Sequence, residues 1–221
     1  MTKKINIYLY VIITISAITV FLILIIPIAV NKEIYENLHK KVFVVKISAE
    51  TTDYVSECGG VIMENGYILT VAHPFRKIKK FTYDDLIISA YDHKNNCTYY
   101  PKILKIDESA DLALLSAVDL PTSSVRLSDS ASDCKGQYSY IHCLSNSHRI
   151  IKRHISNFAS DGKRNYIAID TEIKNGFSGY PVTDKTGLLI GIICSYDSIN
   201  KTTYALNANS IKKFLEDFNS E

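Results

Sequence analysis

An apolar stretch without a charged side chain, residues 5–30, constrains the fold of this chain more than any other feature. At about 1.5 Å of rise per residue it forms a helix about 39 Å long, more than the roughly 30 Å hydrocarbon core of a bilayer. A cleaved signal peptide has a shorter apolar region and a small-residue cleavage site, whereas this run is long and has Pro27 near its end. The sequence therefore predicts an uncleaved transmembrane signal anchor over residues 1–31, with cleavage as the alternative.

The charges that flank this stretch indicate its orientation. Lys3 and Lys4 favour a cytoplasmic N-terminus, although Lys32 follows the span closely and weakens this bias. We therefore expect a single-pass membrane protein whose remaining residues lie outside the cytoplasm, in a periplasm or at a cell surface. Residues 32–41 have apolar side chains at helical spacing and are expected to form a short connecting helix.

The residues after the predicted anchor have the composition of a β-sheet protein. Val, Ile, Thr and Tyr are frequent, and turn residues recur between short apolar runs, so an all-β domain is expected. About 180 residues are sufficient for two small barrels but leave no room for a further domain. The formal net charge of +2 is close to neutral, so nucleic acid is not expected as a partner.

The segment Asn175-Gly176-Phe177-Ser178-Gly179-Tyr180-Pro181 has the composition of a turn that presents a nucleophilic serine. A serine hydroxyl needs a base to take its proton, and it needs backbone N–H donors aimed at the oxyanion that forms on the attacked carbonyl. Gly176 allows a bend in which its own N–H and that of Ser178 converge on one point. Such a turn also occurs by chance, so its interpretation depends on residues elsewhere in the chain.

Two upstream residues could complete such a site. A β-branched strand over residues 67–72 ends beside His73, and a histidine at a strand end can act as a general base. Asp111 directly precedes an apolar strand, where a buried carboxylate would hold the imidazole in one tautomer. The chain order is His, Asp, Ser, and Tyr180 stands where a nucleophile elbow needs glycine, so the α/β-hydrolase fold is excluded.

With these segments the chain resembles the chymotrypsin-like serine peptidases, and within them the HtrA/Deg group. The similarity covers most of residues 42–215. Residues 59–70 resemble the strand pair before the catalytic histidine, and residues 107–115 resemble the strand of the catalytic aspartate. Residues 170–181 resemble the nucleophile loop.

The resemblance implies a fold for the whole domain. After the transmembrane helix, residues 42–221 are expected to form an all-β domain of two six-stranded antiparallel β-barrels. The barrels are expected at about 42–120 and 125–210. HtrA relatives usually carry a C-terminal PDZ domain, whereas none is expected in this chain.

The resemblance also implies the activity, that of a membrane-anchored serine endopeptidase acting on proteins or peptides. Ser178 would attack a peptide carbonyl, His73 would take its proton and later return it to the leaving amine, and Asp111 would orient His73. The N–H groups of Gly176 and Ser178 would form the oxyanion hole. Neither a metal nor a cofactor is implied, and a homo-oligomer is compatible with the sequence.

The primary substrate pocket is expected between two segments of the second barrel. Its predicted lining residues are Glu172, Ile173, Ile193, Cys194 and Ser195. An inward-pointing Glu172 would favour a basic substrate side chain. In HtrA-like members the equivalent position often lies outside the pocket, with Ile173 nearer its base, so we expect a small or medium apolar side chain.

Two residues of the nucleophile loop depart from the family pattern. Phe177 stands where the family usually has Asn or Asp, so pairing of an acid with a new N-terminus is not available for activation. Tyr180 replaces a second glycine, and its Cβ restricts the backbone near the oxyanion hole. Both support the alternative function, a catalytically inactive barrel that acts as a peptide-binding or scaffold module. A protease that cuts one membrane partner is a third hypothesis.

The cysteines and histidines leave further alternatives. The cysteines are Cys58, Cys97, Cys134, Cys143 and Cys194. Their odd number leaves at least one thiol unpaired within the chain, and both a Cys134–Cys143 disulfide and five reduced thiols fit the sequence. Cys143 could also be read as part of a metal cluster with His142, His148 and His154. In the family these residues would lie on two neighbouring strands and their loop, without zinc-type spacing, so no metal site is expected.

Overall fold

A computed structural model of the chain provides the structure. It describes residues 2–80, 86–123, 125–129, 135–144, 147–173 and 176–220, with side chains described outside 2–12 and 77–80. The chain divides into two compact units, Met1–Asn37 and Leu38–Glu221, which are considered separately.

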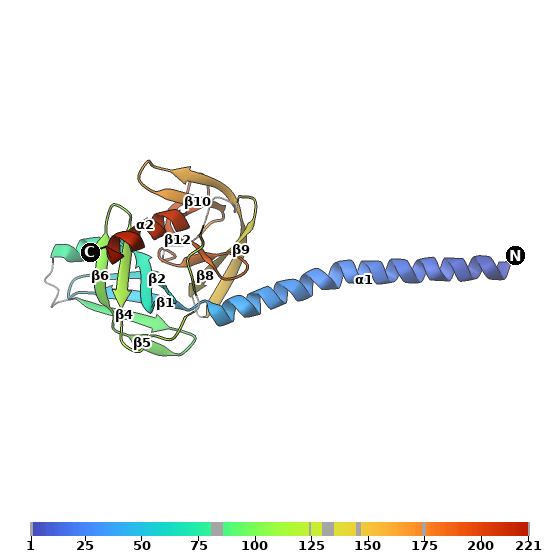
Figure 1. Ribbon diagram of the computed structural model, residues 1–221, viewed down its shortest axis with the longest axis horizontal. Helices are drawn as coiled ribbons and strands as arrows, with labels where there is room; N and C mark the ends of the chain where they lie inside the picture. The colour runs from blue at the N-terminus through green and yellow to red at the C-terminus, as the bar shows by residue number, and fades with distance from the viewer. Residues whose placement is uncertain are drawn as a thin grey trace. The chain divides into compact units, whose positions relative to one another are not determined.

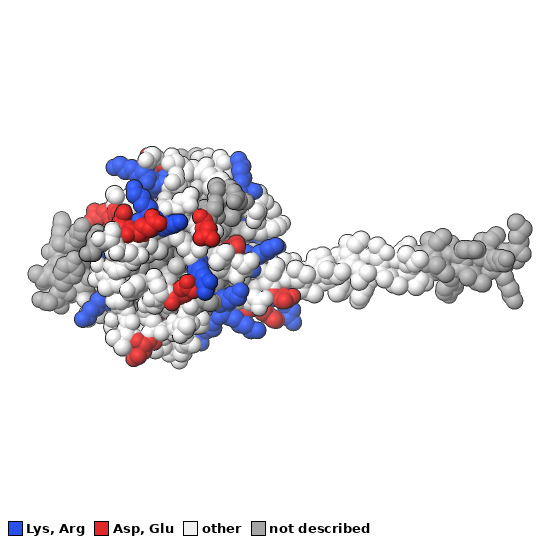
Figure 2. Space-filling view, in the orientation of Figure 1, with Lys and Arg blue, Asp and Glu red and all other residues white. Residues whose placement is uncertain are grey.

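The N-terminal unit belongs to one long helix, α1, which spans Thr2–Lys41 and runs from blue at the N-terminus in Figure 1. Residues 32–41, expected as a separate connecting helix, continue this same helix. The large apolar side chains between Ile13 and Val30 are exposed, and Figure 2 shows no charged atoms along this part of the helix. By length and composition α1 could cross a membrane.

The larger unit begins with an antiparallel sheet of seven strands, in the order β5-β4-β1-β2-β3-β7-β6. Its strands are β1 (Val44–Glu50), β2 (Val55–Ile62), β3 (Tyr67–Val71), β4 (Ile87–Asp92), β5 (Cys97–Tyr99), β6 (Lys102–Asp107) and β7 (Leu112–Ser116). A 3₁₀ helix, η1 (His73–Lys80), follows β3. Side chains alternate across β1, where Val45, Ile47 and Ala49 are buried, as expected for a strand with one face on a core.

The remaining strands form a closed antiparallel barrel in the order β10-β13-β12-β11-β8-β9. They are β8 (Tyr138–Leu144), β9 (His148–Ser160), β10 (Asn165–Asp170), β11 (Pro181–Thr183), β12 (Leu189–Asp197) and β13 (Thr202–Asn207). Figure 1 shows this barrel in yellow to red beside the cyan and green first sheet. The predicted all-β fold of two antiparallel barrels, preceded in the chain by an apolar helix, is confirmed. The first sheet is a half-barrel with seven strands rather than six.

The turn between β4 and β5 is stabilised by side-chain hydrogen bonds. The buried Asp92 side chain accepts hydrogen bonds from the backbone N–H of Lys94 (2.9 Å) and from the side-chain amide of Asn95 (2.7 Å). Asn96 adopts a φ of +49°, a conformation that asparagine tolerates better than most residues. These hydrogen bonds stabilise the turn of the β4–β5 hairpin.

A second helix, α2 (Ala208–Asn219), covers part of the barrel. The side chain of Asn207 caps its first turn by accepting a hydrogen bond from the Ser210 N–H (3.0 Å), which satisfies a helix N–H that has no intrahelical partner. Ile211 and Phe214 are buried. Phe218 makes an edge-to-face ring contact with Tyr67 of β3 (5.9 Å between centroids), so α2 contacts both sheets.

Candidate active site

Strand pairing brings His73 and Asp111 together. Strands β3 and β7 are antiparallel neighbours, with Val71 opposite Leu112 at one end of the pair. His73 lies two residues beyond Val71, and Asp111 lies one residue before Leu112. The Ala72 N–H donates a hydrogen bond to the Asp111 carbonyl across this end (3.2 Å). Two neighbouring strands therefore place the imidazole and the carboxylate at the same edge of the half-barrel.

The two side chains are in direct contact. The His73 backbone N–H donates to Oδ1 of Asp111 (2.9 Å), and Nδ1 of the His73 ring lies 3.0 Å from Oδ2. An ionised carboxylate only accepts hydrogen bonds, so this contact places the hydrogen of the neutral ring on Nδ1. The Nε2 atom is then the basic nitrogen of the ring. Asp111 is only 5% exposed.

The loop that carries Ser178 is hydrogen-bonded to both sheets. The Ser178 carbonyl accepts a hydrogen bond from the Gly59 N–H of β2 (2.7 Å), and the Gly179 N–H donates to the Ile193 carbonyl of β12 (2.7 Å). Gly179 has a φ of +88°, and a Cβ at this position would lie 2.1 Å from the Gly59 carbonyl oxygen. Only glycine fits there, because both the conformation and the space exclude a side chain.

Tyr180 occupies the interior behind this loop. Its side chain is 2% exposed, and its hydroxyl donates to the Leu144 carbonyl (3.3 Å). A Cβ added to Gly59 would lie 2.3 Å from two atoms of the Tyr180 ring, so the ring rests directly on the Gly59 backbone. Tyr180 is not among the described residues with a positive φ. Replacement of the family's second glycine therefore places no strained backbone next to Ser178.

His73 and Ser178 line one cleft, which has a volume of about 260 Å³. Gly176 lines it as well, with a φ of +92° and open space around the position of a Cβ. The other lining residues are Ser56, Glu57, Pro74, Ile173, Ser195 and Tyr196. The cleft is therefore lined by strand β2 of the half-barrel and by strand β12 of the closed barrel.

The structure separates the predicted pocket residues into three groups. Ile173 and Ser195 line the cleft. Glu172 is exposed and is not among the lining residues. Ile193 and Cys194 are buried in β12 and are not among the lining residues. The segment before Gly176, residues 174–175, lies outside the described residues.

Sequence reasoning did not identify Glu57 or Arg76. Glu57 lies on β2 at the cleft, where Lys46 of β1 forms an ion pair with it (2.6 Å). Arg76 contacts Asp111 from η1. No local pattern marks either residue, because each reaches the site only through strand pairing or through the 3₁₀ conformation of η1.

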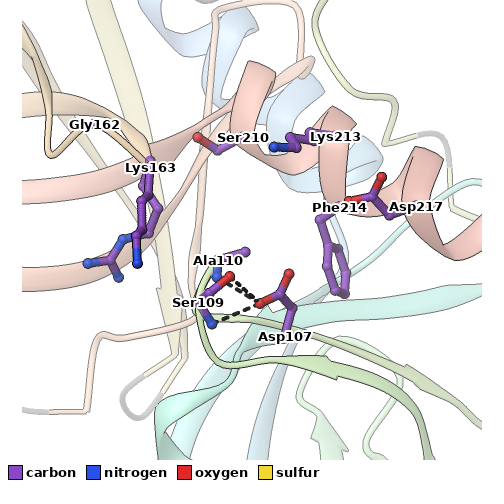
Figure 3. A pocket seen from close by; sticks show the side chains of 10 residues that line it. Asp107, Ser109, Ala110, Gly162, Lys163, Ser210, Lys213, Phe214 and Asp217 are labelled. Atoms are coloured by element: carbon purple, nitrogen blue, oxygen red, sulfur yellow. Dashed lines mark hydrogen bonds between the residues drawn. The ribbon is translucent and has the colours of Figure 1, made fainter.

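A second cavity, of about 400 Å³, lies on another side of the Asp111 turn and is shown in Figure 3. Ser109 and Ala110 of that turn line it, together with residues of α2 and of the β9–β10 turn. Oδ1 of Asp107 accepts hydrogen bonds from the Ser109 N–H (2.8 Å) and the Ala110 N–H (2.9 Å). These bonds shape the turn from which Asp111 emerges.

The described cysteines are free thiols, namely Cys58, Cys97, Cys143 and Cys194. Burial raises the pKa of Cys58 to about 12 and that of Cys194 to about 11, so neither is a thiolate near neutral pH. Cys143 donates to the Arg149 carbonyl (3.7 Å). The other member of the suggested disulfide, Cys134, lies outside the described residues.

Three histidines form a hydrogen-bonded chain at one side of the barrel. Nδ1 of His142 lies 3.1 Å from Nε2 of His148, whose Nδ1 lies 3.2 Å from Nδ1 of His39. Nε2 of His142 lies 2.9 Å from the Thr183 hydroxyl. His154 lies apart, against the Tyr138 ring. Within the described part of the chain, no group of three or more metal-ligating side chains has the geometry of a metal site.

The half-barrel, the closed barrel and the cleft lined by both define the fold of the chymotrypsin-like serine peptidases. The chain belongs to the trypsin-like peptidase family, because the family profile of the trypsin-like peptidase domain matches residues 58–192, more than half of its length. No curated protein matches the chain in sequence.

Two solved structures show the same fold. The Rv3671c protease from M. tuberculosis in its active form matches with a TM-score of 0.68 at 17% identity, covering 85% of this chain and 84% of that one. The inactive form of the Rv3671c protease matches with a TM-score of 0.65 at 16% identity, covering 87% of this chain and 95% of that one. Identities this low establish the fold alone.

Proposed function

We propose that the protein is a membrane-anchored serine endopeptidase that hydrolyses peptide bonds through an acyl-enzyme. The observation that carries the proposal is the contact between His73 Nδ1 and Asp111 Oδ2, at a histidine that shares its cleft with Ser178. Ser178 attacks the substrate carbonyl while Nε2 of His73 takes the hydroxyl proton and later gives it to the leaving amine. A water molecule, activated by His73 in the same way, then attacks the acyl-enzyme ester and releases Ser178.

The oxyanion hole in this proposal is formed by the N–H groups of Gly176 and Ser178. The positive φ of Gly176 and its position on the cleft support this role. Backbone donors are effective because they are fixed before charge develops on the oxygen. Burial of Tyr180 behind the loop, with no positive φ, supports an active enzyme over the inactive peptide-binding barrel.

The cleft supports a preference for a small or medium apolar side chain on the acyl side of the scissile bond. Ile173 is 8% exposed and lines the cleft, whereas Glu172 is exposed to solvent. The exposed apolar surface of α1 supports anchoring in a bilayer. The proposal also holds that the peptidase is similar to the HtrA/Deg group and that its peptidase domain lies outside the cytoplasm.

Hydrolysis of peptides by the purified full-length chain tests this function. The chain in detergent micelles is incubated with a mixed peptide library, and the new termini are identified by mass spectrometry. We expect cleavage after small or medium apolar residues by the wild type and by Ser220→Ala, a matched serine substitution at the C-terminal end of α2. Cleavage should be absent in Ser178→Ala. A folded wild type that binds peptides and cuts none would establish the inactive peptide-binding barrel instead.

A further inference from the structure

Arg76 lies on the same side of η1 as His73. In a 3₁₀ helix, residues three positions apart are eclipsed, and His73 and Arg76 have this spacing within η1 (His73–Lys80). Nη2 of Arg76 donates to Oδ1 of Asp111 (3.4 Å) and to the Glu108 carbonyl (3.2 Å). One guanidinium thus contacts both the carboxylate and the backbone of the turn that presents it.

Asp111 needs such contacts for two reasons. It has a φ of +56°, a conformation that costs roughly 1–3 kcal/mol for residues other than glycine and persists only where neighbouring groups hold it. Its carboxylate is also 8% exposed, and a buried charge is unfavourable without hydrogen bonds and an opposite charge. His73 supplies hydrogen bonds to both oxygens. Arg76 supplies the positive charge.

We propose that Arg76 is a positioning residue for the catalytic carboxylate. It holds the Asp111 turn so that Oδ2 stays directed at Nδ1 of His73, and it does not touch the substrate. This inference rests on the proposed function, because it concerns the orientation of the general base in that reaction. Arg76 is 44% exposed and only Asp111 is buried, so water can reach the guanidinium side of the pair, and His73 still donates to both Asp111 oxygens when Arg76 is replaced; the larger effect is therefore expected on turnover.

Other charged and titratable groups also surround the Asp111 carboxylate. Arg164 of the β9–β10 turn lines the same cavity as Ser109 and Ala110 and interacts with Asp111 electrostatically. Burial, with a smaller contribution from the Asp111 carboxylate, raises the pKa of Cys58 on β2 and of Cys194 on β12, so both thiols are neutral near it. Arg164 already forms an ion pair with Asp161 (2.8 Å). Arg76 is the cation with a hydrogen bond to Asp111 in the part of the chain that the structure describes.

The test compares Arg76→Met and Arg76→Lys with Arg126→Met in the full-length chain in detergent. Arg126 is the control, because its side chain is likewise exposed and ion-paired, but with the exposed Glu64. We expect Arg76→Met to lower kcat about tenfold, with KM and the unfolding temperature nearly unchanged. Arg76→Lys, which keeps the charge, should recover most of the loss. Arg126→Met should retain wild-type kcat.

The proton NMR spectrum gives a readout that does not depend on turnover. The Nδ1–H proton of His73, bonded to the Asp111 carboxylate, should give a downfield signal in the wild type that exchanges faster with water in Arg76→Met. Full kcat and an unchanged signal in Arg76→Met would overturn the inference while leaving the proposed function in place. An inactive wild type would refute the proposed function, and the NMR comparison would then decide alone whether Arg76 orders the pair.

Discussion

Substitution of Gly59 by alanine tests how the nucleophile loop is supported from behind. An ideal Cβ at Gly59 would lie 2.3 Å from Cδ1 and Cγ of Tyr180, whereas carbon atoms in contact are about 3.5–4.0 Å apart. The ring would have to move by about 1.2 Å to restore that separation. It is almost fully buried, and its hydroxyl is bonded to the Leu144 carbonyl, so the space for this movement is missing.

The expected cost is at the upper end of that seen for overpacked cores, about 3 kcal/mol. For a folded unit of this size, that lowers the unfolding temperature by roughly 6–12 °C. Because Gly59 also donates to the Ser178 carbonyl (2.7 Å), a shift of the β2 backbone displaces the nucleophile. We therefore expect Gly59→Ala to reduce peptidase activity as well as stability.

Denaturant unfolding of the full-length chain, followed by near-ultraviolet circular dichroism, measures the effect. Gly60→Ala is the control, because a Cβ there would meet three methyl groups at 2.8–3.1 Å, less close than the ring atoms at Gly59, so a smaller cost is expected. Tyr180→Ala alone should cost about 3–5 kcal/mol through the cavity it leaves. In the double variant the new methyl enters that cavity. The cost of the double variant should therefore be about 3 kcal/mol less than the sum of the two single costs.

Two results would refute this reasoning. The first is a loss of less than about 0.5 kcal/mol in Gly59→Ala, the scatter typical of surface substitutions. The second is simple additivity in the double variant, because independent sites do not share one volume. Either result would mean that the Tyr180 ring does not rest on Gly59.

Three further predictions concern other parts of the molecule. Asp111→Asn should keep the fold but lower kcat by roughly 10⁴-fold, because an amide can present its N–H to Nδ1 and favour the wrong tautomer; peptide hydrolysis measures this, and activity within tenfold of the wild type would contradict it. Burial, followed by the neighbouring His39, lowers the pKa of His148 to about 3 from an ordinary 6.5. The unfolded chain therefore binds a proton at His148 before the folded chain does, and the stability that the neutral His148 contributes above pH 6.5 is lost as the pH falls toward 3. His148→Gln should therefore make the dependence of the unfolding free energy on pH shallower in this window, by at most about 1.4 kcal/mol per pH unit, and an unchanged slope would speak against it. Asn207→Ala removes the cap of α2 and should cost about 1 kcal/mol in the same unfolding assay, whereas Asn207→Asp should be nearly neutral.

The elements around the site could be predicted where one local pattern determines them. The strand before His73, the apolar strand after Asp111 and the small residues around Ser178 each have a distinct sequence pattern, and the pairing of Val71 with Leu112 explains why the first two meet. The all-β fold followed from the frequent Val, Ile, Thr and Tyr and the recurring turn residues, and the two barrels followed from the family resemblance.

Features that depend on tertiary contacts could not be predicted in this way. The interior position of Tyr180 depends on the absence of a side chain at Gly59, far away in sequence. The contact of Arg76 with Asp111 requires the 3₁₀ conformation of η1. The turn between β4 and β5 is held by hydrogen bonds to the Asp92 side chain, and an aspartate among turn residues does not by itself indicate these contacts.

Covalent labelling tests the central claim, that Ser178 is an activated nucleophile. The full-length chain in detergent is incubated with a fluorophosphonate, digested, and mapped by mass spectrometry, with Ser178→Ala and His73→Ala treated in parallel. We predict one adduct, on Ser178, that is absent from Ser178→Ala and strongly reduced in His73→Ala. A folded wild type that forms no adduct, or an adduct on another serine that persists in Ser178→Ala, would contradict the account.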